Sequence, residues 1–119
     1  MWTILFQSIS VTVEVVFTSN PNAHPIPSRT VNVLQGTTGF KILELASQKN
    51  PSFTFEFKKF SFGDLITSIN GVKQDPAAKL SWLIYKNGVE ANVGIDELIP
   101  SNGDILTFKY EKYWSKLFY

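Results

Sequence analysis

Alternation of apolar and polar residues is the clearest pattern near the start of the chain. From Ser8 to Phe17 every second position is apolar, at Ile9, Val11, Val13 and Val15. A period of two predicts a strand with one buried and one wet face. Arg29–Leu34 repeats this alternation as a second strand, and residues 18–28, which hold three prolines, predict a loop between the two strands.

One stretch changes to the period of a helix. After Gly39 the apolar residues fall at spacings of three and four, at Phe40, Leu43 and Ala46, with Ile42 and Leu45 beside them. Thr37 or Thr38 can cap its start, and Asn50-Pro51 ends it. We therefore predict one long helix, of about three turns, between about Thr38 and Asn50.

Alternating segments return after the helix. Asn70-Gly71 and Asn87-Gly88 follow two of them directly and predict tight reversals with positive φ. Two strands, one helix and then several strands predict an α+β fold, a β-grasp-like mixed sheet with one main helix, in a single domain over residues 1–119. The expected later strands are Phe53–Lys58, Leu65–Ile69, Leu80–Tyr85 and Ile105–Glu111.

Aromatic residues are concentrated in two of the later segments. Phe53, Phe55 and Phe57 alternate with polar residues, and we expect their side chains in the core. The C-terminal tail, residues 113–119, is unusually aromatic for a chain end. We expect it to contribute to the core or to assembly, because free tails rarely keep so much apolar surface in water.

An ordered series of short motifs carries a family resemblance. It is similar to the C-terminal domain of the animal cobalamin carriers, namely intrinsic factor, transcobalamin and haptocorrin, over about Val31 to Tyr110. The upstream segment Ile42–Ala46, followed by Lys49–Phe53, particularly resembles intrinsic factor. The series comprises an aromatic-Gly step at Phe62-Gly63, Ser68-Ile69-Asn70-Gly71, Trp82, Asn87-Gly88, Val93-Gly94-Ile95 and Asn102-Gly103-Asp104.

The resemblance implies a ligand-facing surface. Ser61, Phe62 and Gly63 match the family's Ser-Trp-Gly or Tyr-Gly step, and Trp82 matches the tryptophan of its Tyr-Trp step. Ser81 stands where the family usually has tyrosine, which removes a large flat contact. Ligand contact and core packing remain alternative roles for Phe62 and Trp82. The ligand-facing loop of the family is matched by Asn92, Val93 and Gly94.

Composition and single residues exclude several kinds of chemistry. The net charge of +1, without a basic stripe, argues against nucleic-acid binding. The chain has no cysteine, and its one histidine, His24, lies in the proline-rich loop away from any serine elbow. Neither a metal-ligand spacing nor a phosphate-binding loop is present. We therefore expect no enzyme, no metal site and no resident cofactor.

Two function classes remain. The resemblance implies a secreted, non-enzymatic module that binds cobalamin, another corrinoid or a different flat amphipathic molecule. The alternative is a protein-interaction or structural module of the same fold that binds no cobalamin. A lone module offers one wall to a ligand, so a second copy or a partner chain is expected to supply the other.

Location is inferred from the resemblance. The first residues lack the basic start and uninterrupted apolar run of a signal peptide, and no apolar run is long enough to span a membrane. If the protein is exported, we expect this sequence to be the mature form behind an added Met1.

Overall fold

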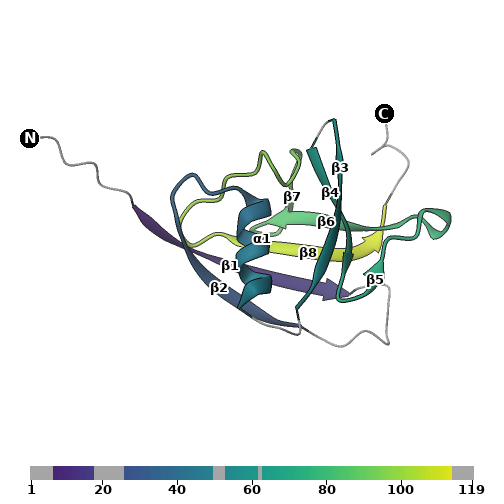
Figure 1. Cartoon of the computed structure of the whole chain (residues 1–119), viewed down its shortest axis with the longest axis horizontal. Helices are drawn as coiled ribbons and strands as arrows, with labels where there is room; N and C mark the ends of the chain where they lie inside the picture. The colour runs from purple at the N-terminus through teal and green to yellow at the C-terminus, as the bar shows by residue number, and fades with distance from the viewer. Residues whose placement is uncertain (1–6, 18–25, 50–52, 62, 114–119) are drawn as a thin grey trace, which may run out of the picture.

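The computed structural model describes residues 7–17, 26–49, 53–61 and 63–113. Mostly strands, with one α-helix, make up this part of the chain (Figure 1). In chain order the elements are β1 Ser8–Phe17, β2 Ile26–Leu34, α1 Gly39–Gln48, β3 Phe55–Phe60, β4 Gly63–Ile69, β5 Val72–Lys73, the short 3₁₀ helix η1 Pro76–Ala78, β6 Leu80–Lys86, β7 Val89–Glu90 and β8 Ile105–Lys112.

The larger sheet has five strands in the order β2-β1-β8-β6-β7, in which β1 and β8 run parallel and the other neighbours run antiparallel. The alternation predicted for β1 is confirmed. Its apolar residues are buried, and its polar residues lie on the outer face, where Ser10 Oγ donates to Asn32 Oδ1 at 2.8 Å and the hydroxyls of Thr12 and Thr30 pair at 3.1 Å. The buried set on β1 is Ile9, Val11, Val13 and Val15.

The predicted helix is confirmed as α1. Thr38 is its N-cap, and the side chain of Thr38 accepts a hydrogen bond from the Lys41 N–H at 3.3 Å. Ile42, Leu43 and Ala46, which share one face by their spacing, are fully buried against β1 and β2. The helix therefore contributes the apolar layer that covers one side of the large sheet.

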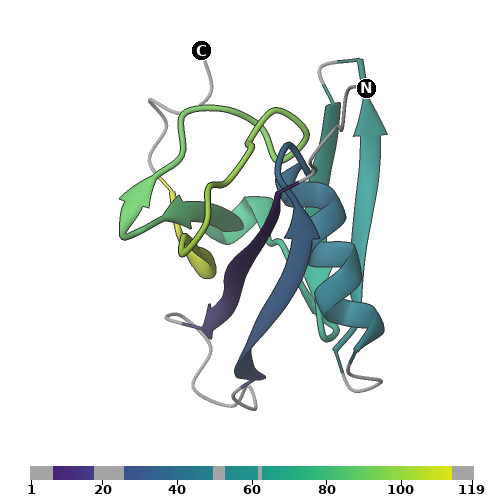
Figure 2. The same cartoon turned by 90° about the vertical axis from the view of Figure 1, so that its left-hand side faces the viewer.

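A second sheet, in the order β3-β4-β5, stands beside α1 and crosses the large sheet steeply (Figures 1 and 2). The sequence predicted a single mixed sheet, and the structure has two. Residues 55–73 pair among themselves, because β3, β4 and β5 follow one another through short connections. The Asn70-Gly71 turn has the expected positive φ values of 50° and 79°.

Three predicted features differ in the structure. Residues 26–28, predicted as loop, belong to β2, and the edge of a sheet tolerates Pro27 because no neighbour needs its missing N–H. Phe53 is buried as expected, but Phe57 is 46% exposed because β3 lies at the margin of the small sheet. The predictions for His24, Phe62 and residues 114–119 lie outside the described residues.

Candidate functional site

The loop of residues 91–99 is anchored to the start of α1. The Gly39 N–H donates to the Leu98 carbonyl at 2.7 Å, and the Phe40 N–H donates to the Ile95 carbonyl at 3.1 Å. These are two of the N–H groups that a helix start leaves without intrahelical partners. Ile95 and Leu98 also bury their side chains. These contacts hold the C-terminal side of the segment that carries Asn92–Gly94, and on its other side the Ala91 N–H donates to the Ile84 carbonyl at 2.9 Å.

Gly63 connects the same loop to the small sheet. The Asp64 N–H donates to Asp96 Oδ2 at 2.7 Å, so a carboxylate from the loop lies directly over the start of β4. A Cβ at position 63 would be 2.8 Å from Asp96 Oδ2, and the backbone there has a φ of +124°. The positive φ favours glycine here, and a Cβ would also displace the Asp96 carboxylate, which gives the Phe62-Gly63 step a structural reason.

A small cavity of about 160 Å³, here called the small cavity, lies at this junction. It brings together three residues that the resemblance pointed to: Gly63, Trp82 and Gly94. It is lined by Gly63, Asp64, Leu65, Ile66, Trp82, Ile84, Gly94, Ile95, Asp96 and Glu97.

A larger cavity, of about 460 Å³, lies along β6 and is here called the strand cavity. Leu65 and Trp82 line it as well as the small cavity, so the two adjoin. Ser81 is also part of its wall. The lining residues are Leu65, Gln74, Pro76, Leu80, Ser81, Trp82, Leu83, Glu90 and Tyr113.

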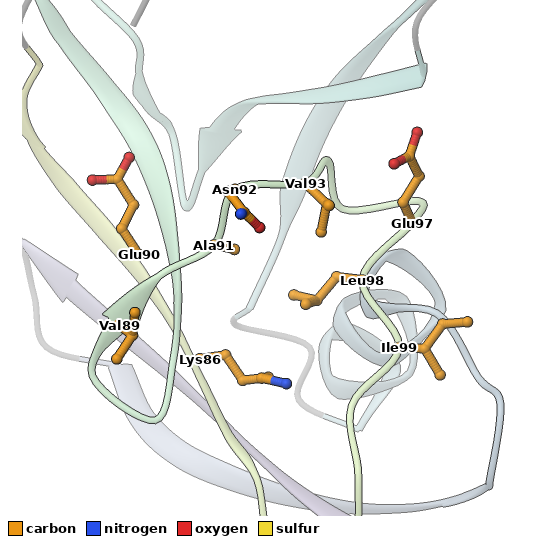
Figure 3. Close-up of a pocket in the computed structure, with 9 residues that line it drawn as sticks. All are labelled: Lys86, Val89, Glu90, Ala91, Asn92, Val93, Glu97, Leu98 and Ile99. Atoms are coloured by element: carbon orange, nitrogen blue, oxygen red, sulfur yellow. The ribbon is translucent and has the colours of Figure 1, made fainter.

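A third, open cavity of about 490 Å³, here called the loop cavity, lies between the β6–β7 hairpin and the 91–99 loop. Figure 3 shows Lys86, Asn92, Val93 and Leu98 directed toward its middle, whereas Glu97 and Ile99 point away. Its interior therefore offers both apolar and polar groups, the latter including one amide and one ammonium group. The full lining is Lys86, Val89, Glu90, Ala91, Asn92, Val93, Glu97, Leu98 and Ile99.

The three cavities form one stretch of surface. Glu90 lines both the loop and strand cavities, and Glu97 lines both the loop and small cavities. Most of the residues that the resemblance pointed to lie on this surface: Gly63, Ser81, Trp82, Asn92, Val93 and Gly94. Ser61 is exposed but lines none of the three cavities, and Phe62 is outside the described residues.

Trp82 contributes an edge to this surface rather than an open ring face. Its side chain is 4% exposed and packs edge-to-face on Phe17, with centroids 5.3 Å apart, and against Tyr110 at 5.1 Å. Its indole N–H donates to the Val72 carbonyl at 2.9 Å. Neighbouring strand residues point to opposite faces, so Ser81 and Trp82 do not present one shared flat contact. Of the two roles left open for Trp82, core packing accounts for most of its ring.

Asp64 carries the main electrostatic feature of the small cavity. Partial burial, together with the charge and hydrogen bonding of Asp96, raises the pKa of the Asp64 carboxyl above its ordinary value. Its Oδ1 atom is buried and has no hydrogen-bond partner in the structure. The ionised form of Asp64 is therefore disfavoured in the folded protein.

Asp64→Asn is expected to flatten the pH dependence of stability. An acid whose pKa is raised on folding binds more protons in the folded state than in the unfolded state. The free energy of unfolding therefore falls as the pH rises from the pKa of the unfolded carboxyl, near 3.8, through the raised pKa of the folded one. The amide removes this loss and should leave the variant at least as stable as the parent at neutral pH. Melting temperatures measured from pH 3 to 8 check this, and parallel curves for parent and variant would contradict it.

In the described ranges, no group of three or more His, Cys, Asp and Glu side chains is placed to hold a metal ion. Outside the cavities, a hydrogen bond to Glu111 and partial burial raise the pKa of Tyr85 to about 12, so its phenol stays protonated at neutral pH. No helix among the described residues is both long and apolar enough to cross a membrane.

Sequence reasoning missed two features of the site. Leu65, Leu83 and Tyr113 gave no signal as cavity residues, since each fits an ordinary strand position. The contact between Asp64 and Asp96 joins residues 32 positions apart. The glycine beside Asp64 was the one available hint, because a glycine with positive φ often marks a close approach of another group.

Known proteins share both sequence and fold with this chain. Human cobalamin binding intrinsic factor is 31% identical over 83 residues, which are 70% of this chain and 20% of that protein. Uncharacterized protein CG3556 of Drosophila melanogaster is 28% identical over 90 residues, covering 66% of this chain and 15% of that protein. The chain thus spans a fifth or less of the length of these curated relatives.

Solved structures extend the likeness to the fold. Haptocorrin in complex with Cbi matches with a TM-score of 0.80 and 24% identity, over 94% of this chain and 27% of that chain. A putative metal binding protein from Ruminococcus gnavus matches with a TM-score of 0.62 and 16% identity, over 89% of this chain and 99% of that chain.

A family model agrees with the part of the chain that builds the site. The model described as "Domain of unknown function (DUF4430)" matches residues 36–112, which contain α1, the small sheet and every residue that lines the three cavities except Tyr113. The chain therefore belongs to the DUF4430 family and is homologous to a part of the cobalamin-binding intrinsic factors.

Proposed function

We propose that this chain is a secreted, non-enzymatic module that binds a flat, amphipathic molecule of the corrinoid class across the three cavities. The observation that carries the proposal is the convergence of separate segments on one surface. The Gly63, Ser81-Trp82 and Asn92–Gly94 positions are far apart in the chain, and all line adjoining cavities.

The chemistry of the surface suits such a ligand. A corrinoid combines a broad apolar ring with amide groups at its margin. Val93 and Leu98 offer apolar contact in the loop cavity, and Asn92 offers an amide that can both donate and accept hydrogen bonds. Gly94 has open space where a Cβ would lie, so the backbone there can approach a ligand closely.

The relatives support the ligand class. One is named as cobalamin binding, and haptocorrin was solved in complex with Cbi. The resemblance implies that this module corresponds to the C-terminal domain of such carriers, whose remaining length would then supply a second wall. Taken alone, these 119 residues offer one wall. With one wall, affinity should be no better than micromolar, or about 8 kcal/mol.

Val93→Asp is expected to weaken binding by roughly 1–3 kcal/mol, because it replaces an apolar contact with a charge in the loop cavity. Isothermal titration of the full chain with cyanocobalamin and with cobinamide measures the change. Ile105→Asp is the matched control, since Ile105 is also 40% exposed but lines none of the three cavities. Equal affinities for parent and Val93→Asp, or no heat with either corrinoid, would reject the proposal.

One observation favours the alternative, a protein-interaction module of the same fold. Trp82 buries nearly all of its ring, which leaves less aromatic area for a flat ligand than the resemblance implied. If the titrations show no corrinoid binding while the chain self-associates or captures a defined partner, this alternative replaces the first.

The β-grasp class is our proposal for the fold at its finer level. A β1–β2 hairpin leads into one helix that covers the sheet, and the last strand pairs parallel with the first. These relations support the β-grasp class.

A further inference from the structure

Among the described residues, no strand pairs with the outer edge of β3. It is the terminal strand of the small sheet, and Figure 2 shows it at the margin of the molecule with β4 on its inner side. The residues from Glu56 to Phe60 are all exposed. An open strand edge is a template for pairing with another chain, and its side chains decide which partner fits.

Phe57 gives this edge a pre-ordered apolar contact. Its ring packs edge-to-face on Phe40, with centroids 4.8 Å apart, and lies 6.2 Å from the ring of Phe55. It nevertheless stays 46% exposed. A large ring that is held by neighbours and still exposed loses little conformational entropy when a partner covers it.

We propose that β3 pairs antiparallel with β3 of a second copy of this chain, with Phe57 opposite Phe57. Residues directly opposite each other in an antiparallel pair lie on the same face. In this register Glu56 of each copy therefore faces Lys58 of the other. The two-fold symmetry produces two such ion pairs on one face and a contact between phenylalanine rings on the opposite face.

The charges select this register over its neighbours. A two-fold pairing must be centred on a residue, because otherwise opposite side chains would point to different faces. Centring on Glu56 places two carboxylates opposite each other, and centring on Lys58 or Lys59 places two ammonium groups opposite each other. Like charges directly opposite destabilise a pair. Among these central positions Phe57 alone brings opposite charges together.

A charge-swap series on the full chain tests the proposal by sedimentation equilibrium at low salt. The parent should approach twice the monomer mass of 13.4 kDa as its concentration rises from micromolar to millimolar. Lys58→Glu and Glu56→Lys should each weaken the dimer roughly tenfold or more, because each creates two like-charge pairs. The double variant Glu56→Lys/Lys58→Glu should restore it.

Lys73→Glu is the matched control, since it makes the same charge change on β5, at the other edge of the small sheet. It should dimerise as the parent does. A parent mass of 13.4 kDa at every concentration, an unaffected Lys58→Glu dimer, or a double variant that stays monomeric would each overturn the proposal. Hydrogen exchange on the parent needs no substitution: β3 amides should become more protected as concentration rises, and unchanged exchange would also overturn it.

Discussion

Replacing Trp82 by alanine is expected to lower the free energy of unfolding by about 3–5 kcal/mol, the range for removal of a large buried aromatic side chain. The ring is 4% exposed and lies against Phe17 and Tyr110, so alanine leaves a cavity between strands of the large sheet. It also removes the hydrogen bond to the Val72 carbonyl, which links the large sheet to β5. Urea unfolding followed by circular dichroism measures the loss.

Trp82→Phe separates the packing from the hydrogen bond. Phenylalanine keeps much of the ring volume but cannot donate to Val72, so a smaller loss is expected, of about 1–3 kcal/mol. If Trp82→Ala cost less than about 1 kcal/mol, the ring would not be a core element. Its open face would then return as a candidate contact for a flat ligand.

The β6 sequence explains why the role of Trp82 could not be predicted from the chain alone. In Leu80–Tyr85, five of the six residues are apolar or aromatic, so the alternation does not say which face is buried. β1 is different, because Ser10, Thr12 and Glu14 mark its wet face unambiguously. The structure resolves the ambiguity through pairing, since Trp82 lies opposite the buried Tyr110.

Elements defined by local rules were predictable. The β1 bounds and the single α-helix follow from side-chain period and from capping at Thr38, and the Asn-Gly pairs gave the two reversals. The division into two sheets was not predictable in this way. It depends on which strands become neighbours, and strand period carries no information about that.

The candidate site depends on long-range contacts, which explains its partial prediction. The resemblance supplied the segments, but the loop and small cavities depend on the packing of the 91–99 loop against α1 and β4. Asp96 reaches Asp64 across 32 residues, and Ile95 meets the start of α1. Neither contact has a periodic or motif signature in the sequence.

Ile95→Ala is expected to destabilise the fold by about 2–5 kcal/mol and to loosen the 91–99 loop. The side chain of Ile95 is 2% exposed, and the backbone carbonyl of Ile95 accepts a hydrogen bond from the Phe40 N–H at the start of α1. Loss of the side chain leaves that hydrogen bond without its packing support. Compared with the parent, the variant should then show faster hydrogen exchange at the amides of Gly39 and Phe40, and a smaller change at the amides in the middle of the helix.

Ile99→Ala is the matched control, because Ile99 lies on the same loop but is 53% exposed and points away from the loop cavity (Figure 3). Its effect should stay within about 0.5 kcal/mol. Corrinoid titration then separates stability from function. If the loop carries the site, Ile95→Ala should weaken binding under conditions where it remains folded, since Asn92 and Val93 lose their fixed position. If Ile95→Ala and Ile99→Ala had equal free energies of unfolding and equal rates of amide exchange, the core would not hold this loop in place.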